Sequence, residues 1–167
     1  MTLATATRGG KPSARVVLLK AFDKRGFVFF TNYQSRKGKE LDENPHAALV
    51  LFWQPLDRQI RITGKVEKVT PKESDEYFHS RPLGSRFSAS ISKQSSVIAS
   101  RAELLAKLKK IEEAYPNGDP PRPNHWGGFR VQPNEIEFWQ SGPFRLHDRW
   151  RYRRKRDGAW VMDRLAP

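Results

Sequence analysis

Four short clusters in the sequence carry basic side chains, and three of them combine these with hydroxyl or aromatic side chains, a combination that binds phosphate esters through charge-assisted hydrogen bonds. They are residues 15–20, 31–37, 77–85 and 139–156. The second cluster runs from an apolar strand into a predicted helix N-terminus, where free backbone N–H groups favour anions. Arg36 and Lys37 in that first turn oppose the helix dipole, and a bound phosphate would resolve the conflict. The alternative is a solvated basic turn.

The first and third clusters each leave two interpretations open. Arg15 and Lys20 are five residues apart, so in a regular strand they point to opposite faces and serve different ligands, unless they are simply solvated strand ends. Tyr77 and Arg81 are four residues apart on a predicted helix and share one face. Together with Ser85 they could present a phenol, a guanidinium and a hydroxyl to one phosphate. Alternatively, Arg81 only caps the end of the helix.

The fourth cluster contains a predicted strand in which arginines, from Arg149 to Arg153, alternate with aromatic residues. That alternation gives the strand one cationic face. Basic residues interleaved with aromatic ones are also typical of nucleic-acid surfaces. Asp148, between His147 and Arg149, favours a positioned network over a uniform phosphate-binding stripe.

Several common kinds of catalytic site are excluded by the sequence. It has neither the glycine-rich motif of Rossmann folds nor a Walker lysine loop, and it lacks the H-E-x-x-H and G-x-S-x-G motifs. The four histidines are scattered, and the absence of cysteine rules out thiol catalysis and cysteine-based metal sites. An enzyme with this sequence would therefore depend on an organic cofactor, and no metal is expected.

The composition indicates the class of partner. The 31 basic residues against 18 acidic ones give a net charge of +13, which indicates nucleic acid, a membrane surface or phosphorylated small molecules, with solubility alone as the alternative. No apolar run approaches the roughly 20 residues that span a bilayer, and the N-terminus has no secretory-type apolar segment. The lack of cysteine fits a reducing compartment, so a cytoplasmic location is expected.

Hydrophobic periodicity divides the 167 residues, which fit a single domain, into three parts. The first part contains a short predicted helix at 35–43 and five predicted strands, at 2–7, 14–22, 27–32, 47–53 and 59–69. In the helical middle part, Thr70 and Glu73 form one capping box, and Ser100 and Glu103 form another before an amphipathic stretch. The last part contains four predicted strands, at 129–131, 135–139, 148–154 and 159–164.

This order of elements does not follow the βαβ alternation of a doubly wound fold. We therefore expect a mainly β fold, a closed or split antiparallel barrel with helices packed outside. In the fifth strand, Ile60, Ile62, Gly64 and Val66 alternate with polar residues, so one face should be core and the other solvated.

Ten motifs stand in one order along almost the whole chain. They are R-V-V-L-L-K (15–20), F-F-T-N (29–32), S-R-K (35–37), R-Q-I-R-I-T-G (58–64), Y-F-H-S-R-P (77–82), S-K-Q-S-S (92–96), W-G-G-F (126–129), E-F-W-Q (137–140), R-L-H-D-R (145–149) and D-R-L-A-P (163–167). Each motif is weak alone, but the ten together are highly specific. In this order they resemble the pyridoxamine 5′-phosphate oxidase family of the FMN-binding split-barrel superfamily.

The resemblance implies a single-domain split β-barrel of the antiparallel Greek-key type, assembled as a homodimer with FMN at the subunit interface. The residues that would hold the FMN phosphate, or lie beside it, are Arg15, Thr31, Arg36, Lys37, Gln94 and Ser95. The residues that would line or adjoin the flavin are Val16, Val17, Leu18, Leu19, Lys20, Phe30 and Gln59. Trp139 and Arg149 would reach the same flavin from the partner subunit.

The resemblance also implies a reaction, the oxidation of pyridoxamine or pyridoxine 5′-phosphate by O₂ to pyridoxal 5′-phosphate. Hydrogen peroxide is the co-product, and the amine also yields ammonia. The substrate phosphate would be bound by Lys20, Tyr77, Arg81 and Ser85. Arg145 and His147 would lie over the pyridine ring as the implied catalytic residues. Neither nucleic acid nor a membrane is an implied partner.

Two features depart from the family's pattern. Family members usually carry some tens of residues before the position of Met1, including a segment that helps to cover the substrate. In addition, Arg86-Phe87-Ser88-Ala89 stands where Gln-Ile-Gly-Ala is expected, which adds bulk and charge beside Ser85.

Three other functions compete with the implied one. The first is an FMN-dependent oxidase of another substrate, of the phenazine type, against which Arg81 and Ser85 argue because they match the vitamin B6 phosphate site. The second is a basic nucleic-acid-binding barrel without catalysis, which would be colourless and bind with a steep salt dependence. The third is a flavin-binding protein that no longer turns over.

Overall fold

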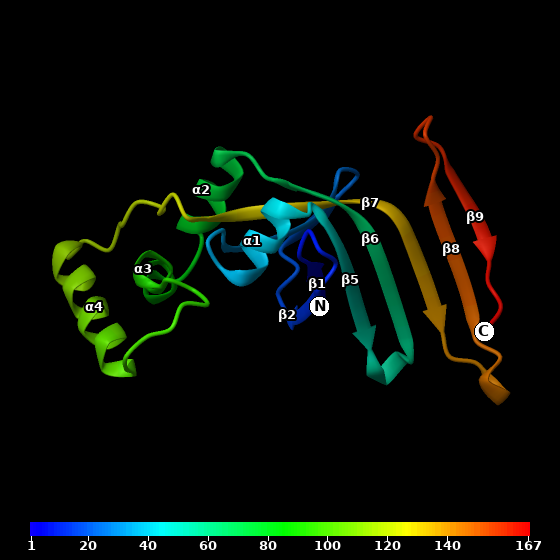
Figure 1. Ribbon diagram of the computed structural model, residues 1–167, viewed down its shortest axis with the longest axis horizontal. Helices are drawn as coiled ribbons and strands as arrows, with labels where there is room; N and C mark the ends of the chain where they lie inside the picture. The colour runs from blue at the N-terminus through cyan, green and yellow to red at the C-terminus, as the bar shows by residue number, and fades with distance from the viewer. The chain divides into compact units, whose positions relative to one another are not determined.

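The computed structural model describes all 167 residues, and the chain divides into two compact units. The first unit comprises residues 1–29, 40–67 and 130–167, and the second comprises residues 30–39 and 68–129. Figure 1 labels the helices and strands of both units. No helix has both the length and the apolar composition to cross a membrane.

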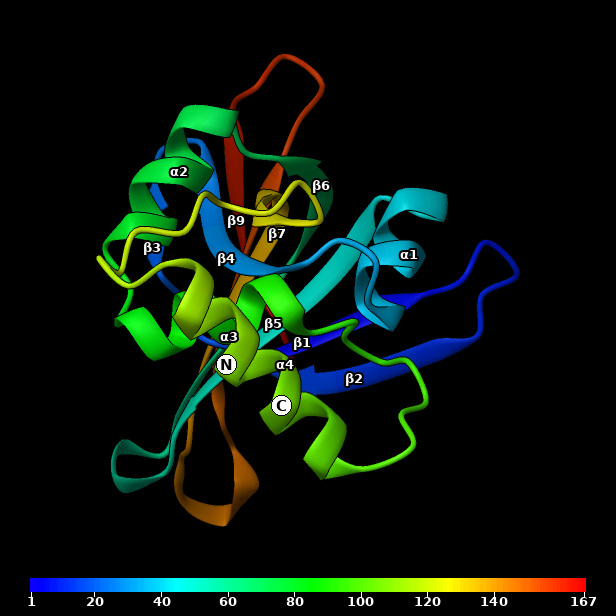
Figure 2. The ribbon, with the colours of Figure 1, turned by 90° about the vertical axis from the view of Figure 1, so that its left-hand side faces the viewer.

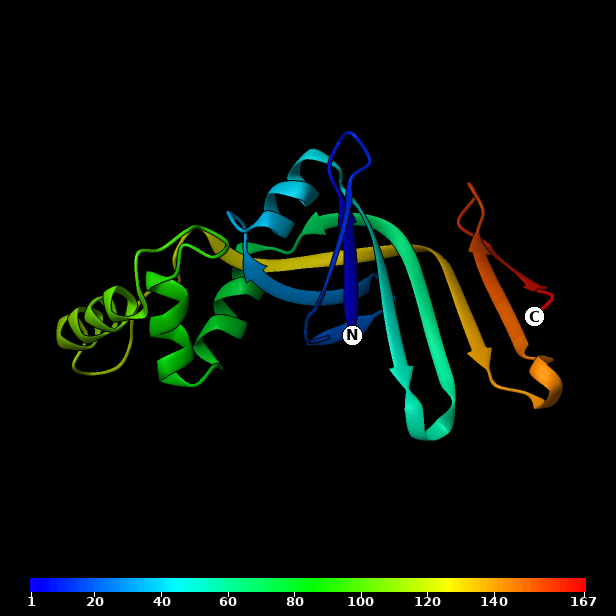
Figure 3. The ribbon, with the colours of Figure 1, turned by 60° about the horizontal axis from the view of Figure 1, so that its bottom comes forward.

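Most of the strand residues belong to the first unit. The strands are β1 Thr2–Ala6, β2 Pro12–Val16, β3 Ala21–Asp23, β4 Gly26–Asn32, β5 His46–Trp53, β6 Arg58–Lys68, β7 Trp126–Gln140, β8 Asp148–Arg154 and β9 Trp160–Arg164. They form one sheet in the order β2-β1-β5-β6-β7-β4-β3, and β8 and β9 extend it from β7. The paired strands run antiparallel, as the β1–β2 hairpin in Figure 2 and the β5–β6 hairpin in Figure 3 show. The predicted mainly antiparallel β fold is confirmed.

The helices are α1 Arg36–Glu43, α2 Pro71–His79, α3 Leu83–Ile91 and α4 Arg101–Ala114, with short 3-10 turns at Gln54–Leu56 and Pro143–Arg145. At the start of α2, the Thr70 and Glu73 side chains bond each other's backbone N–H, which confirms the predicted capping box. At the start of α4, Ser100 accepts from the Glu103 N–H, but the Glu103 carboxylate pairs with Lys107. The second predicted capping box is therefore only half formed.

Two strand predictions are wrong in detail, and one helix was not predicted. The predicted strand 14–22 is two strands, β2 and β3, because the backbone changes partner: the Val17 N–H bonds Met1, whereas the Lys20 N–H bonds Val28. The argument from a regular strand between Arg15 and Lys20 therefore fails. Helix α3 was not predicted, because Pro82, which ends one helix, also stands at the N-cap of the next.

The second wrong strand prediction concerns β7. The predicted strands 129–131 and 135–139 are one continuous strand, β7, which passes through Pro133 without a break. The helix predicted from the amphipathic pattern after Ser100 is confirmed as α4, which contacts α3 but contains no buried residue. Leu105, on its apolar face, is 54% exposed.

The core of the first unit confirms the predicted alternation in β6. Ile62, Gly64 and Val66 are buried and their polar neighbours are exposed. Leu3 of β1 and Leu49 of β5 are fully buried on the same sheet. Gly64 also lets two backbones approach closely, since a Cβ at this position would overlap the carbonyl group of Gln132.

Replacing Gly64 by alanine is therefore expected to lower the free energy of unfolding by about 2 kcal/mol, the typical cost of forcing extra atoms into a packed site. Denaturant unfolding measures the change. Gly84→Ala is the matched control, because a Cβ at that α3 position meets no atom within 4 Å. Alanine there should leave stability unchanged or raise it by up to about 1 kcal/mol. Equal midpoints for the Gly64 variant and the natural chain would contradict the close approach.

Candidate functional site

Five predicted cofactor-phosphate residues meet in the second unit, at the N-terminus of α1. We call Thr31, Arg36, Lys37, Gln94 and Ser95 the Lys37 cluster. The Lys37 ammonium donates to Thr31 Oγ1 at 3.2 Å and to Gln94 Oε1 at 3.0 Å. The Arg36 backbone N–H donates to Ser95 Oγ at 3.2 Å. The end of β4 and the first turn of α1 thus meet the loop after α3, which lies about sixty residues further along the sequence.

The Lys37 cluster has the charge and the backbone geometry of an anion site. α1 has no acidic residue in its first turn, so the positive end of the helix dipole is reinforced by Arg36 and Lys37. Ser95 has φ = +71°, a left-handed conformation that costs energy for a residue with a side chain. This strained backbone brings the Ser95 hydroxyl to the helix terminus. Hydroxyl donors, an ammonium and a helix N-terminus at one point fit a phosphate monoester.

A second cluster in the same unit surrounds Arg81, at the end of α2. We call Phe30, Tyr77, Arg81 and Trp126 the Arg81 cluster. The guanidinium carbon of Arg81 lies 4.6 Å from the ring centroid of Trp126. The Phe30 ring stacks on Tyr77 at 3.9 Å and on Trp126 at 5.6 Å. Phe30, predicted to line the flavin, therefore packs in this unit against the predicted substrate residue Tyr77.

The guanidinium of Arg81 is not neutralised by a carboxylate within the chain. Its Nη1 is buried and has no hydrogen-bond partner. Burial lowers the pKa of Arg81, and the nearby Tyr77 opposes that change, but an arginine remains a cation in proteins. A buried donor without a partner costs free energy, so this position favours an anionic ligand.

The two bulky residues that depart from the family's pattern, Arg86 and Phe87, are largely shielded from solvent. Ser85 lies in the first turn of α3, and Arg86 beside it pairs with Asp119 at 3.2 Å. Phe87 is 3% exposed and joins the core. The second unit therefore accommodates the added bulk and charge beside Ser85.

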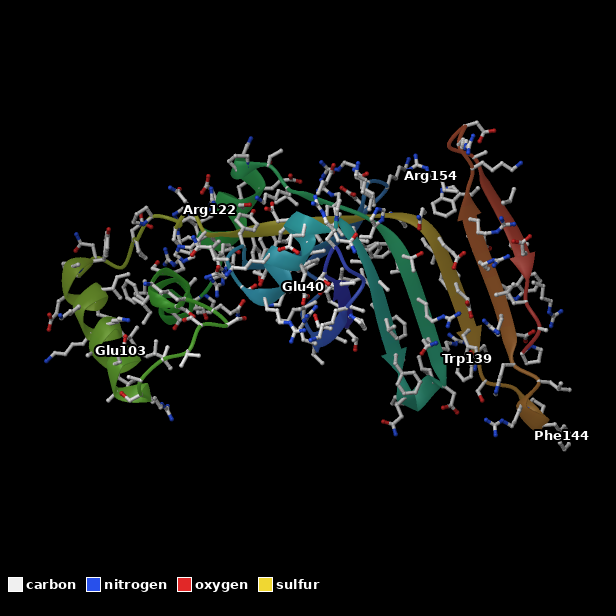
Figure 4. The ribbon with its side chains drawn as sticks, viewed as in Figure 1. Glu40, Glu103, Arg122, Trp139, Phe144 and Arg154 are labelled. Atoms are coloured by element: carbon white, nitrogen blue, oxygen red, sulfur yellow. The ribbon has the colours of Figure 1, made fainter.

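In the first unit, the Arg15 guanidinium forms an ion pair with a buried carboxylate. Its guanidinium is 3.3 Å from Glu40, which is 4% exposed, and it also donates to Thr5 Oγ1 at 2.5 Å. Glu40, labelled in Figure 4, was not singled out in the sequence because the pairing joins β2 to α1 across 25 residues. After Arg15 the chain exposes Val16 and Leu18, by 78% and 65%, so part of the predicted flavin-lining segment is uncovered apolar surface.

The first unit also brings Gln59 and Trp139 to one pocket of about 440 Å³. Its lining is mostly apolar: Trp53, Leu56, Arg58, Gln59, Ile60, Phe138, Trp139, Gln140, Asp148 and Trp150. The Trp139 ring lies 4.8 Å from the His147 ring, and Trp139 is labelled in Figure 4. The Gly142 N–H donates to His147 Nδ1 at 3.2 Å, so a neutral His147 carries its proton on Nε2.

Arg145 lies between β7 and β8 in a strained turn. Phe144 and Arg145 have φ of +56° and +64°, two consecutive left-handed residues that are not glycine. Phe144 is 93% exposed at the tip of this turn in Figure 4. Strain of this kind is concentrated at functional sites.

Arg149 is held by a buried acid that the sequence did not reveal as important. Its Nε donates to Glu137 Oε1 at 2.9 Å and its Nη1 donates to the Ala166 carbonyl at 2.9 Å. Arg61 donates to the other oxygen of Glu137, which is 3% exposed. Burial raises the pKa of Glu137, but the hydrogen bonds from Arg149 and Arg61 outweigh it and hold this pKa below its ordinary value.

Glu137→Gln is expected to lower the free energy of unfolding at pH 7 by about 1–3 kcal/mol, because a charge-assisted pair of bonds is lost. A carboxyl with a lowered folded-state pKa stabilises the protein above its unfolded pKa, near 4.3, and loses that contribution as pH falls through the folded value. The difference between the two proteins should therefore shrink below about pH 4. Urea unfolding across this range measures it, and a difference that grows with acidity would contradict the assignment.

The remaining arginines of β8 do not form a uniform cationic face. Arg151 and Arg153 both pair with Asp163 of β9, at 3.1 and 2.8 Å, and Arg164 pairs with Asp148. Arg151 and Arg153 share one carboxylate, so their charge is partly neutralised. This pairing favours the predicted positioned network over a phosphate-binding stripe for nucleic acid.

Comparison with known proteins gives matches along the chain. The family model described as pyridoxamine 5′-phosphate oxidase matches residues 1–115. The model of the pyridoxine 5′-phosphate oxidase C-terminal dimerisation region matches residues 126–167. Proteins named pyridoxine/pyridoxamine 5′-phosphate oxidase from Bordetella pertussis and Trichormus variabilis are each 58% identical over the whole of this chain, which spans 79% and 78% of their lengths.

Two solved structures share the fold. PhzG from Burkholderia lata 383, in complex with tetrahydrophenazine-1-carboxylic acid, has a TM-score of 0.94 and 35% identity, covering 99% of this chain and 81% of its own. A pyridoxamine 5′-phosphate oxidase-related, FMN binding protein from Nostoc punctiforme has a TM-score of 0.80 and 15% identity, covering 99% and 86%. The second likeness shows the fold alone.

Proposed function

Because the chain belongs to the pyridoxamine 5′-phosphate oxidase family, we propose that it uses FMN and O₂ to oxidise pyridoxamine or pyridoxine 5′-phosphate to pyridoxal 5′-phosphate. Hydrogen peroxide is the co-product, and the amine, after hydrolysis of its imine, also releases ammonia. In this proposal residues 1–167 act as one FMN-binding domain of a homodimer. The match of residues 126–167 to a dimerisation region supports the dimer.

The observation that carries the proposal is the unpartnered, buried Nη1 of Arg81 in the unit that also holds the Lys37 cluster. The cofactor and the proposed substrates each carry one phosphate monoester. The second unit offers a cationic position for each of them, and both positions were predicted from the sequence. Two such positions favour a pair of small phosphate esters over one long polyanion.

The proposed cofactor contacts begin with the Lys37 cluster, which holds the FMN phosphate together with Arg15. The segment Val16–Lys20, Phe30 and Gln59 line or adjoin the flavin. Trp139 and Arg149 contact the flavin bound by the partner subunit. When bound, FMN supplies the acceptor for a hydride from C4′ of the substrate, and O₂ takes up the electrons as hydrogen peroxide.

The proposed substrate contacts are supplied by the chain's own charged and polar groups. Lys20, Tyr77, Arg81 and Ser85 bind the substrate phosphate. Arg145 holds the ring and favours the charge arrangement of hydride loss. His147, whose Nδ1 accepts the Gly142 N–H, presents Nε2 to the substrate and positions it. These contacts fix the position of the reacting carbon, and this positioning is the protein's contribution to catalysis.

A second candidate is an oxidase of a phenazine-type substrate. The likeness to PhzG, with a TM-score of 0.94, favours it. The relatives at 58% identity, which carry the other name, favour the vitamin B6 phosphates, as does the phosphate-binding pattern of Arg81 and Ser85.

One experiment tests cofactor and reaction together. The purified protein, loaded with FMN, should show flavin absorption near ~450 nm that bleaches on anaerobic addition of pyridoxine 5′-phosphate and returns with O₂. Tetrahydrophenazine-1-carboxylic acid is the comparison substrate. Bleaching by that compound alone would establish the second candidate, and a protein that never retains flavin would overturn both.

A further inference from the structure

Arg81 is held by an aromatic face instead of an acid. Its guanidinium lies over the Trp126 ring at 4.6 Å, and its Nη1 has no hydrogen-bond partner. Trp126 itself, at the start of β7, is 7% exposed. The contact between a buried indole and a cationic side chain therefore replaces the ion pair that usually accompanies a buried arginine.

This replacement has a consequence for ligand binding. A carboxylate partner would neutralise the guanidinium and use the N–H groups that lie in its plane. An indole face attracts the cation through its ring quadrupole and occupies none of those N–H groups. The contact with Trp126 therefore leaves the charge of Arg81 and its Nη1 donor without a partner in the chain, and a phosphate is the group that arginine binds through charge-assisted bonds.

The position of Trp126 does not depend on Arg81. Its ring lies nearly parallel to the Phe30 and Tyr77 rings, at interplanar angles of 14° and 10°, and Phe78 meets it edge-on at 5.4 Å. Its carbonyl accepts from Arg122 Nη1 at 2.7 Å, and Arg122, labelled in Figure 4, is held in turn by Asp75 at 2.6 Å. The indole is therefore a rigid platform on which the flexible arginine lies.

We propose that Trp126 is a positioning residue for the phosphate group of the substrate, acting through Arg81. The inference rests on the proposed function, and it adds a residue to which the sequence motifs assign no role. Because the phosphate is remote from the reacting carbon and is bound equally before and during the reaction, loss of the platform should weaken binding without slowing the chemical step.

The test uses the FMN-loaded enzyme with Trp126→Leu and Trp126→Phe. Leucine removes the aromatic face, so KM for pyridoxine 5′-phosphate should rise about tenfold, with kcat within twofold and the flavin content unchanged. The inhibition constant of inorganic phosphate, a competitor for the same position, should rise in parallel. Phenylalanine keeps a smaller face and should raise both values about threefold. Trp160→Leu, on the half-exposed strand β9, is the control and should change neither value.

A folded, flavin-loaded leucine variant with KM and the phosphate inhibition constant both within twofold of the natural enzyme would overturn the inference. So would a fall in kcat at constant KM. If the leucine variant does not fold, KM and the phosphate inhibition constant of the phenylalanine variant decide instead. If the natural protein oxidises no vitamin B6 phosphate, the proposed function fails, and calorimetric titration with inorganic phosphate still decides the inference: weaker binding by the variant supports it and equal binding overturns it.

Discussion

Replacing Arg145 by alanine is expected to lower kcat/KM for pyridoxine 5′-phosphate about 100-fold or more, while the affinity for FMN changes less than twofold. The structure holds Arg145 at φ = +64° beside Phe144 at +56°, a strained turn that costs about 1–2 kcal/mol for each residue. The Leu146 N–H bonds the Pro143 carbonyl and closes the turn. The fold therefore tolerates strain to project a guanidinium that forms no ion pair within the chain.

A guanidinium oriented toward charge that develops in the transition state stabilises that state by about 3 kcal/mol. This stabilisation corresponds to the expected 100-fold loss in kcat/KM. Steady-state kinetics and flavin titration measure the two effects separately. Arg156→Ala, in the exposed turn between β8 and β9, is the matched control and should alter neither. Equal losses in kcat/KM and FMN affinity would move Arg145 from the substrate site to the cofactor site.

Elements defined by local chemistry were predicted well from the sequence. The capping box at Thr70 needs only four consecutive residues, and the alternation in β6 needs only one buried face. The bounds of β8 agree with the predicted 148–154 because a basic turn and a loop flank the strand. In each case the signal lies within the element itself.

Elements that depend on distant partners were predicted poorly. Residues 17–20 read as one strand with their neighbours, but the backbone leaves β1 and joins β4 there, and no local pattern reports a change of partner. Pro133 lies inside β7, although proline is normally a signal for the end of a strand. The buried acids Glu40 and Glu137 read as ordinary helix and strand residues, respectively, because the arginines that pair with them come from elsewhere in the chain.

The candidate site shows the same division. Arg36 and Lys37 were selected on a local conflict between two cations and a helix dipole, and the structure places them at that terminus. Gln94 and Ser95 carried no comparable signal, since their part in the cluster depends on a loop that returns to α1. Their prediction came from the family resemblance. Trp126 belonged to one of the ten motifs, yet its contact with Arg81 could not be inferred before the two elements were placed.

Lys37→Ala is expected to weaken FMN binding about 10- to 100-fold, equivalent to about 1.4–2.8 kcal/mol. The Lys37 ammonium lies between Thr31 Oγ1 and Gln94 Oε1, beside the N-terminus of α1, so its removal takes a positive charge and a donor from the proposed phosphate position. Much of the helix dipole remains, which is why binding should weaken and not disappear. Fluorescence titration of the apoprotein with FMN gives the dissociation constant.

Two variants separate a role in the phosphate site from a general effect of charge. Lys39→Ala removes an equal charge from an exposed position on the same helix and should change FMN affinity less than twofold. Lys37→Arg keeps the charge and should recover part of the loss. Because the contact is to phosphate and not to the ring, riboflavin, which lacks the phosphate, should bind the natural chain and Lys37→Ala equally. An unchanged FMN affinity in Lys37→Ala, or an equal loss for riboflavin, would remove Lys37 from the phosphate site.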